Sequence, residues 1–573
     1  MKTAWIAVAY GALAVLMTWP VAATLTRDLP GDLGDPVFVC WVIARASDHW
    51  LQLLAGDASA IPRFWQAGIF YPEPDATAFS EHFVLHALVA LPVWALTRNV
   101  ILCYNLLFIA SFALSGLAMF LLARELTGRP RAAFVAGLVF AFLPYRMATL
   151  AHLQVLSSYW MPFALLGFLR FAATGRNGAL AGGAAALWAQ SLASGYYLVF
   201  FGPFLALFAV VTLWAYRRLT DVTAWAKLAA SAVAVALATL PFALPYLRLQ
   251  QRYGFRRSLQ EVEFFSADLL AWFTAYDAMN LWGSLQALVR AEGFLFPGLT
   301  GPVFMLAGLI AAWRASRGTD DASARARVAA AFGTVAALIA FWLALGPNPS
   351  IDTQPIGLPS LYRVFYDYVP GYDVARVPSR FAMILFLIMA VAAGFALAPL
   401  DRSRWRVVLP LVGAMALADG WAAPLPMNRT WTTYPGELKP PEARIYPERE
   451  APLVYRYLRM LPEGTVVAEF PFGLSEREIQ YTYYSAVHRK PIVNGYSGAF
   501  PMVYQLRMKH LHRPWLDIHR AAAQLYDDGV THVVVHTGAW EDDGGRRLAA
   551  DFQAVGLLVE ARFGDDVVLR LPR

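Results

Sequence analysis

The sequence predicts a polytopic α-helical membrane protein with about eleven transmembrane helices and a C-terminal α/β domain outside the cytoplasm. Three observations carry this prediction. The 573 residues are 58% hydrophobic and only 15% charged, whereas soluble globular proteins carry about 25% charged residues. Long apolar runs alternate with short basic loops through residues 1–423. Over residues 424–573 the apolar runs stop, and mixed helix and strand patterns replace them.

The apolar runs are close to the roughly 20 residues that cross the hydrocarbon core of a bilayer. The candidate spans are residues 4–24, 101–123, 133–149, 157–173, 178–195, 197–216, 225–247, 298–313, 327–346, 380–399 and 406–423. We expect the first of them to be a retained signal-anchor helix, since it is long for a cleaved signal peptide. Arginine and lysine gather in every second loop, for example at residues 124–131 and 314–327. The positive-inside rule places these loops in the cytoplasm.

Residues 82–97 (HFVLHALVALPVWALT) are apolar but are expected not to span. Such a helix would reach only about 24 Å, less than the roughly 30 Å hydrocarbon core. Counting it as a span would also move the basic loop at 124–131 to the outside, against the charge bias. We therefore expect a juxtamembrane or re-entrant helix, a cytoplasmic N-terminus and an external first loop over residues 26–100.

The C-terminal region alternates strand-like and helical patterns, which indicates a small α/β domain. Strands are expected at residues 465–470, 491–494, 531–536 and 565–571, and helices at residues 479–487 and 520–528. With a cytoplasmic N-terminus and about eleven spans, an odd number, this domain (residues 424–573) is expected to lie outside the cytoplasm.

The most informative motif is the Gly- and Pro-bounded acidic turn at residues 31–36 (GDLGDP), in the external loop. It holds Asp32 and Asp35 three residues apart, ahead of a helical pattern at residues 37–54. Acidic side chains beside a bilayer usually have a function, because burying their charge is costly. A simpler interpretation makes Asp35 only the start of a helix, since Asp followed by Pro favours one.

The acidic turn, Glu81-His82 before a short apolar helix, the run LLARELTGRPR at residues 121–131 and RVPSR at residues 376–380 together resemble the GT-C glycosyltransferases. The bacterial aminoarabinose and galacturonic-acid transferases are similar types, and the resemblance covers the topology of residues 1–423. It implies transfer of a sugar from a polyprenyl-phosphate donor. The family usually has two adjacent acidic residues, whereas Asp32 and Asp35 are separated by two residues.

Sugar transfer needs a base that takes the proton of the acceptor hydroxyl, and a positioned Asp can serve. Asp35 is our first choice, and Asp32 is the alternative or a residue that orients the acceptor. Glu81 is expected to bind acceptor hydroxyls or to help hold a divalent cation such as Mg²⁺ or Mn²⁺, and its neighbour His82 is expected to contribute to substrate binding. The spacing alone does not specify a metal, and the cofactor requirement stays open.

The departing phosphate favours arginine, whose planar fork matches phosphate oxygens. Arg376 and Arg380 are four residues apart before a span and are the expected phosphate ligands, with snorkelling to lipid headgroups as the alternative. His152 is expected to donate to phosphate or sugar, or else to pack at the interface. Tyr196 and Tyr197 suit sugar stacking or an aromatic belt.

The expected partners are a polyprenyl-phosphate-linked sugar, membrane lipids and a glycan, lipid or protein acceptor of the cell envelope. Nucleic acid is not expected, because the basic residues lie in short loops between spans. The expected location is the bacterial inner membrane. A transporter or flippase of a lipid-linked saccharide is the main alternative, although transporters place charges at the bilayer midplane and in paired repeats. A non-catalytic scaffold or sensor is the third.

The topology gives a testable prediction. A cysteine placed at Gly128, in a basic loop, should be shielded from an impermeant thiol reagent in intact cells, whereas one at Gly544 should react. Permeabilised cells, in which both positions should label, are the control. Labelling at Gly128 but not at Gly544 would reverse the arrangement.

Overall fold

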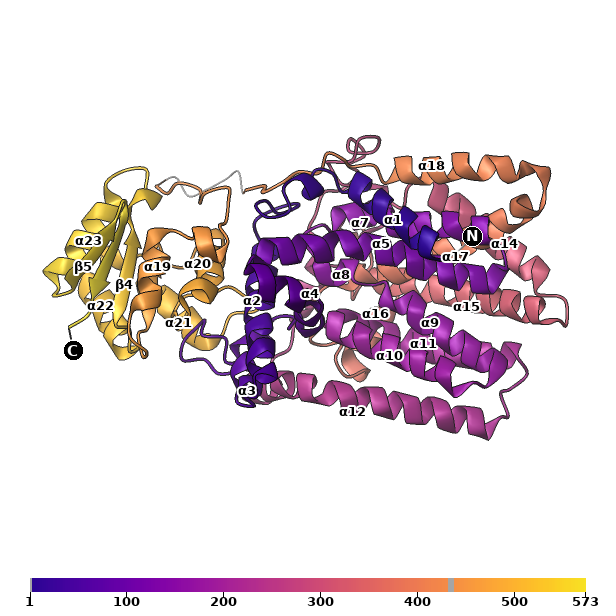
Figure 1. The fold of residues 1–573 in the computed structure, drawn as a ribbon, viewed down its shortest axis with the longest axis horizontal. Coiled ribbons are helices and arrows are strands. Elements are labelled where there is room, and N and C mark those ends of the chain that lie inside the picture. The colour runs from indigo at the N-terminus through magenta and orange to yellow at the C-terminus, as the bar shows by residue number, and fades with distance from the viewer. Residues whose placement is uncertain (1–2, 431–436, 573) are drawn as a thin grey trace. The chain divides into compact units, whose positions relative to one another are not determined.

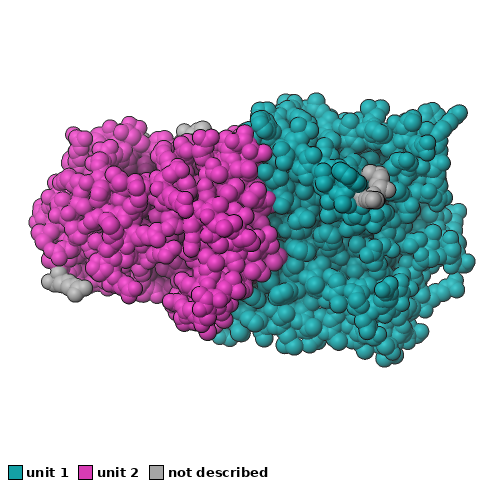
Figure 2. Space-filling view, viewed as in Figure 1, with its two compact units in different colours: residues 1–20, 108–244, 250–425 teal, residues 21–107, 245–249, 426–573 magenta. Residues whose placement is uncertain are grey.

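The computed structural model of the chain describes residues 3–430 and 437–572. The chain forms two compact units, which Figure 2 shows in different colours. Unit 1 comprises residues 1–20, 108–244 and 250–425, and unit 2 comprises residues 21–107, 245–249 and 426–573. The chain therefore enters unit 2 early, leaves it for the helical body, and returns to it for the C-terminal region.

Unit 1 is helical. Its helices are α1 (Thr3–Met17), α6 (Pro130–Ala141), α7 (Pro144–Ala148), α8 (Leu153–Leu156), α9 (Trp160–Thr174), α10 (Asn177–Ala193), α11 (Gly195–Ala215), α13 (Leu259–Phe264), α14 (Thr300–Ala315), α15 (Asp321–Ala344), α16 (Leu361–Tyr368), α17 (Ala382–Arg402) and α18 (Leu409–Asp419). Two long helices contribute residues to both units, α5 (Val100–Thr127) and α12 (Val222–Tyr253). A two-stranded hairpin joins β1 (Ser350–Ile351) to β2 (Gln354–Pro355).

Seven helical segments in the described part of the chain are long and apolar enough to cross a membrane: Val100–Thr127, Pro130–Ala148, Leu153–Thr174, Gly195–Ala215, Val222–Tyr253, Asp321–Ala344 and Pro378–Arg402. The predicted polytopic helical architecture is therefore present, while the count of about eleven spans stays a prediction. Some expected spans are short helices. The first, for example, ends at Met17, just before Trp19-Pro20, since proline cannot continue the backbone ladder.

Helix α17 is the centre of unit 1. In the candidate span Pro378–Arg402, 89% of an apolar 18-residue stretch is buried inside the protein. Helices α6, α14 and α15 all pack against α17. The α14–α17 contact is especially close at Gly308, where a Cβ would lie only 1.9 Å from the Ala392 carbonyl oxygen. Small residues allow such close approach of membrane helices, so a side chain at Gly308 would force the two helices apart.

Unit 2 contains α2 (Asp35–Leu54), α3 (Ala60–Trp65), α4 (Val84–Thr97) and a C-terminal α/β region (Figure 1). The C-terminal helices are α19 (Leu453–Met460), α20 (Ser475–His488), α21 (Met502–Leu511), α22 (Ile518–Asp527) and α23 (Gly544–Ala554). The strands are β3 (Val467–Phe470), β4 (His532–His536), β5 (Leu558–Phe563) and β6 (Asp566–Arg570). Helix α2 packs against α4 on one side and α20 on another.

The four strands form one sheet in the order β3-β4-β6-β5. The β3–β4 pair is parallel, and the β4–β6 and β6–β5 pairs are antiparallel. The expected strand at residues 491–494 makes only a parallel bridge, between Ile492 and Val467. Strand β5, whose residues are largely exposed, is not predicted from the sequence.

Helix α4 has 14 residues and is about 21 Å long at 1.5 Å per residue, less than the hydrocarbon core. It is an apolar helix below the length of the seven candidate spans. Its length agrees with the expectation that residues 82–97 do not cross, and the membrane placement itself stays a prediction.

The C-terminal region is held by a buried ion pair whose removal is testable. Arg507, only 1% exposed, donates to both carboxylate oxygens of Asp528 at 2.8 and 3.0 Å. Arg507→Ala should lower the free energy of unfolding by about 3–5 kcal/mol, because it leaves the largely buried Asp528 carboxylate without its counter-charge. Arg546→Ala is the matched control, since the Arg546–Asp543 pair is 74% exposed on both sides and should cost at most about 1 kcal/mol. Denaturant unfolding of the purified protein measures both. Equal losses would contradict the prediction.

Candidate functional site

The acidic turn is held in place by a segment far along the chain. Gly31 N–H donates to the Pro426 carbonyl at 2.9 Å, and Arg429 N–H donates back to the Gly31 carbonyl at 2.8 Å. Asn428 adds side-chain bonds: its Oδ1 accepts Leu29 N–H at 2.8 Å, and its Nδ2 donates to Asp28 Oδ1 at 2.9 Å. These contacts join residues about 400 positions apart, so the turn is fixed by tertiary structure.

The two central carboxylates have different local settings. Asp32 Oδ1 accepts Gly34 N–H at 2.8 Å, a contact that closes the turn locally. Asp35 is the first residue of α2 and precedes Pro36, which suits the first helical positions. The N-terminus of a helix favours negative charge. Both side chains are partly exposed. Asp35 is therefore positioned by the 20-residue helix α2, whereas one carboxylate oxygen of Asp32 is engaged in a hydrogen bond to the backbone of the turn.

Glu81 and His82 belong to unit 2 as well. His82 Nδ1 accepts Val84 N–H at 3.2 Å at the start of α4, and its ring packs edge-on against Trp65. Burial lowers the pKa of His82 to about 4, so the ring is neutral at physiological pH. These contacts give His82 a structural role at the helix start, and acceptor binding by Glu81 and His82 stays a prediction.

A second group of predicted residues gathers in unit 1 around a buried carboxylate. Arg380 donates to Glu292 Oε1 at 2.5 Å and to Oε2 at 3.4 Å, and the two side chains are 3% and 10% exposed. His152 Nε2 lies 3.7 Å from Glu292 Oε1. The Arg380 guanidinium also sits 4.6 Å from the ring centroid of Tyr196. We call Glu292, Arg380, His152 and Tyr196 the Glu292 cluster.

Different elements supply this cluster. Arg380 lies in the 3₁₀ turn Pro378–Phe381 that leads into α17, and Tyr196 lies at the start of α11. His152 precedes α8, and Glu292 belongs to the loop between the Leu269–Phe273 turn and α14, where its φ is +56°. Burial would raise the pKa of Glu292, but Arg380 and His152 outweigh it and hold the pKa below its ordinary value of 4.5.

Arg376 adds positive charge close to this cluster and contributes to lowering the pKa of Glu292. Its guanidinium lies 4.7 Å from the ring centroid of Phe265, and its buried Nε has no hydrogen-bond partner among the described residues. Buried donors without partners are rare in folded proteins and are often met by water or a ligand. Two arginines beside one carboxylate leave positive charge that suits a further anion.

Tyr197 and Tyr145 lie near the Glu292 cluster. Both rings are essentially buried, at 0% and 2% exposure, so Tyr197 offers no open face to solvent. The Tyr145 hydroxyl and the Ser379 hydroxyl are buried without a hydrogen-bond partner in the described part of the chain. The region beside Arg380 therefore contains polar groups with unused bonding capacity.

The nine predicted site residues thus divide between the units. Asp32, Asp35, Glu81 and His82 are in unit 2, and His152, Tyr196, Tyr197, Arg376 and Arg380 are in unit 1. Within unit 1, His152 and Arg380 meet at Glu292, which is not predicted from the sequence, and the Tyr196 ring contacts Arg380. The only available signal for Glu292 was the need of buried arginines for a counter-charge. No group of three or more His, Cys, Asp or Glu residues in the described ranges could hold a metal ion.

Comparison with solved structures supports the fold. Arabinofuranosyltransferase AftD from Mycobacteria aligns with a TM-score of 0.55 and 14% identity over 100% of this chain and 42% of AftD. The chain therefore spans less than half the length of AftD. ArnT from Cupriavidus metallidurans aligns over 100% of this chain and 99% of ArnT at 17% identity, with a TM-score of 0.42. ArnT bound to undecaprenyl phosphate gives 15% identity and a TM-score of 0.39, covering 100% of both chains.

At these identities the likeness to AftD shows the fold, and at this level the expected GT-C resemblance is confirmed. No curated protein matches the sequence. A family model matches residues 39–420, which is more than half of the 573-residue chain. The protein therefore belongs to the family described as "Domain of unknown function (DUF6311)".

Proposed function

We propose that this protein is an integral-membrane glycosyltransferase that transfers a sugar from a polyprenyl-phosphate donor to an extracytoplasmic acceptor. The observation that carries the proposal is the fold likeness to an arabinofuranosyltransferase in a chain whose first loop presents an acidic turn at the start of a helix. The seven apolar helices support the membrane location.

Asp35 is the proposed general base. In the transfer, the acceptor oxygen forms a bond to the anomeric carbon while the bond from that carbon to the phosphate oxygen breaks. The electron pair of the broken bond stays on the phosphate, and the acceptor proton goes to the Asp35 carboxylate. Asp32 is better suited to positioning, since its Oδ1 is bonded to Gly34 N–H.

Arg376 and Arg380 are the proposed ligands of the donor phosphate. Arg380 is oriented by its two bonds to Glu292 and by the Tyr196 ring. Arg376 has no acidic partner within hydrogen-bond distance among the described residues and keeps an unused buried Nε. A guanidinium with unused donors can bind phosphate oxygens in a charge-assisted, bidentate way. We therefore assign the larger share of phosphate binding to Arg376.

The first test is sugar transfer in vitro from synthetic polyprenyl-phosphate sugars by the purified protein. Asp35→Asn keeps the shape of the side chain and removes the proton acceptor, so turnover should fall by roughly 10²–10⁴-fold. Asp32→Asn should cost less, and the exposed Asp543→Asn should cost nothing. Full activity in both turn variants would remove the proposed base. A larger loss at Asp32 would exchange the two roles.

The second test concerns the phosphate ligands. Arg376→Ala should weaken donor use by roughly tenfold or more, the effect of losing a hydrogen bond to a charged group. Loss of ground-state binding appears as a raised donor KM, and loss confined to the leaving-group charge appears as a lowered kcat. Arg256→Ala is the matched control, because Arg256 is 51% exposed and only loosely paired with Asp367 and Asp373. Unchanged kinetics in Arg376→Ala would leave the arginine with an interfacial role.

A further inference from the structure

Unit 2 contains a cavity of about 230 Å³ whose lining includes no residue of the acidic turn. It is built by α2, by α3 with the segment that follows it, and by the end of α20. The lining residues are Arg45, His49, Arg63, Gln66, Ala67, Gly68, Ser485, Arg489, Lys490 and Pro491. We call it the α2–α20 pocket. Four of its ten lining residues are cationic, and none is acidic.

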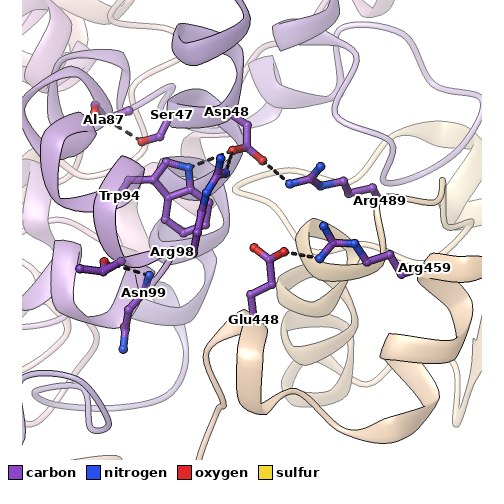
Figure 3. Close-up of polar contacts among 10 residues, drawn as sticks. Ser47, Asp48, Ala87, Trp94, Arg98, Asn99, Glu448, Arg459 and Arg489 are labelled. Carbon is purple, nitrogen blue, oxygen red and sulfur yellow. Dashed lines mark hydrogen bonds and ion pairs between the residues drawn. The ribbon is translucent and has the colours of Figure 1, made fainter.

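The nearby carboxylates do not balance this charge. Asp57 pairs with Arg63, and Asp48 accepts from Arg489 at 3.1 Å. Asp48 is shared, since it also accepts from Arg98 at 2.5 Å and from Trp94 Nε1 at 2.9 Å (Figure 3). There are thus two nearby carboxylates, Asp48 and Asp57, for five cations: the four that line the pocket and Arg98.

Arg45 and Lys490 have no acidic partner among the described hydrogen bonds and ion pairs. Arg45 donates to the Gln66 carbonyl at 3.1 Å, and Lys490 Nζ donates to the carbonyls of Leu461 and Pro462 at 2.5 and 3.2 Å. Carbonyl oxygens satisfy donors but do not neutralise a charge. The pocket therefore keeps a surplus of positive charge next to an open volume.

The pKa of His49 is affected by this positive charge. Burial, and then the neighbouring Arg45 and Arg63, lower the pKa of His49 to about 4. Its Nδ1 is buried and has no hydrogen-bond partner in the described ranges. A neutral imidazole in this position can contribute one further polar atom to a ligand without adding to the charge.

We infer that the α2–α20 pocket binds a phosphate or diphosphate group. Arginine forks and a lysine ammonium are the side chains that recognise phosphate oxygens, and here three arginines and one lysine line one cavity. The volume is below the roughly 300–1,000 Å³ of pockets that enclose drug-sized ligands, so it suits an anionic group better than a whole lipid. The group comes from a free anion or from a lipid headgroup. This inference does not depend on the proposed transfer reaction.

The test measures binding to the full-length purified protein by isothermal titration calorimetry at constant ionic strength. The probes are sodium phosphate, sodium pyrophosphate, and phosphatidic acid in phosphatidylcholine vesicles, with pure phosphatidylcholine vesicles as the blank. Constant ionic strength matters because exposed charges are screened by salt. We expect saturable binding of at least one phosphate probe. Saturation by pyrophosphate identifies a free anion, and saturation by phosphatidic acid alone identifies a lipid-borne phosphate.

Variants make the assignment specific. Arg45→Gln combined with Lys490→Gln should weaken binding roughly tenfold or more, as should Arg63→Gln, whose exposed ion pair contributes little to folding. Arg546→Gln, an exposed arginine outside the pocket, should bind as the unmodified protein does. Absence of saturable binding for every probe would overturn the inference, as would equal affinity in the pocket variants and in Arg546→Gln.

Discussion

The buried ion pair between Arg380 and Glu292 is the constraint on which the helical body depends. A guanidinium that is 3% exposed loses most of its hydration, and the effective penalty for a buried ion is several kcal/mol. Glu292 offsets that penalty with two hydrogen bonds, and the Tyr196 ring covers another face of the cation. Because Arg380 stands at the entrance to the central helix α17, this pair also ties the loop before α14 to the middle of the unit.

The Arg380–Glu292 pair also affects how the Glu292 cluster can bind anions. A fully neutralised arginine would have little reason to bind a substrate phosphate, but Arg376 adds a second cation that one carboxylate cannot also balance. Under the proposed function, Arg380 is held mainly by Glu292, and Arg376 keeps the larger capacity to bind phosphate. Unit 2 shows a similar division, since Asp32 closes the backbone turn while Asp35 stands at the helix start.

The sequence was informative where local patterns decide the structure. Apolar runs located the helices, and Asp35-Pro36 indicated the start of α2, which begins at Asp35. Contacts between distant segments left no such pattern. Glu292 and Arg380 are 88 residues apart in the sequence. The cations of the α2–α20 pocket come from segments more than 400 residues apart. Strand β5 was also missed, because its side chains face solvent and its place is set by pairing with β6.

The attachment of the acidic turn to residues 426–429 has a consequence for biosynthesis. The turn emerges early, yet its hydrogen-bonding partner is synthesised 399 residues later, as the Leu29–Asn428 contact shows. At roughly 5–20 residues per second, that interval is about 20–80 s. During this interval the first loop has left the ribosome, but the segment that fixes its shape has not yet been synthesised. A nascent chain that stops before residue 426 has the helices of unit 1 but lacks the segment whose hydrogen bonds hold the acidic turn, so the turn can take its final shape only after residue 429 has been synthesised.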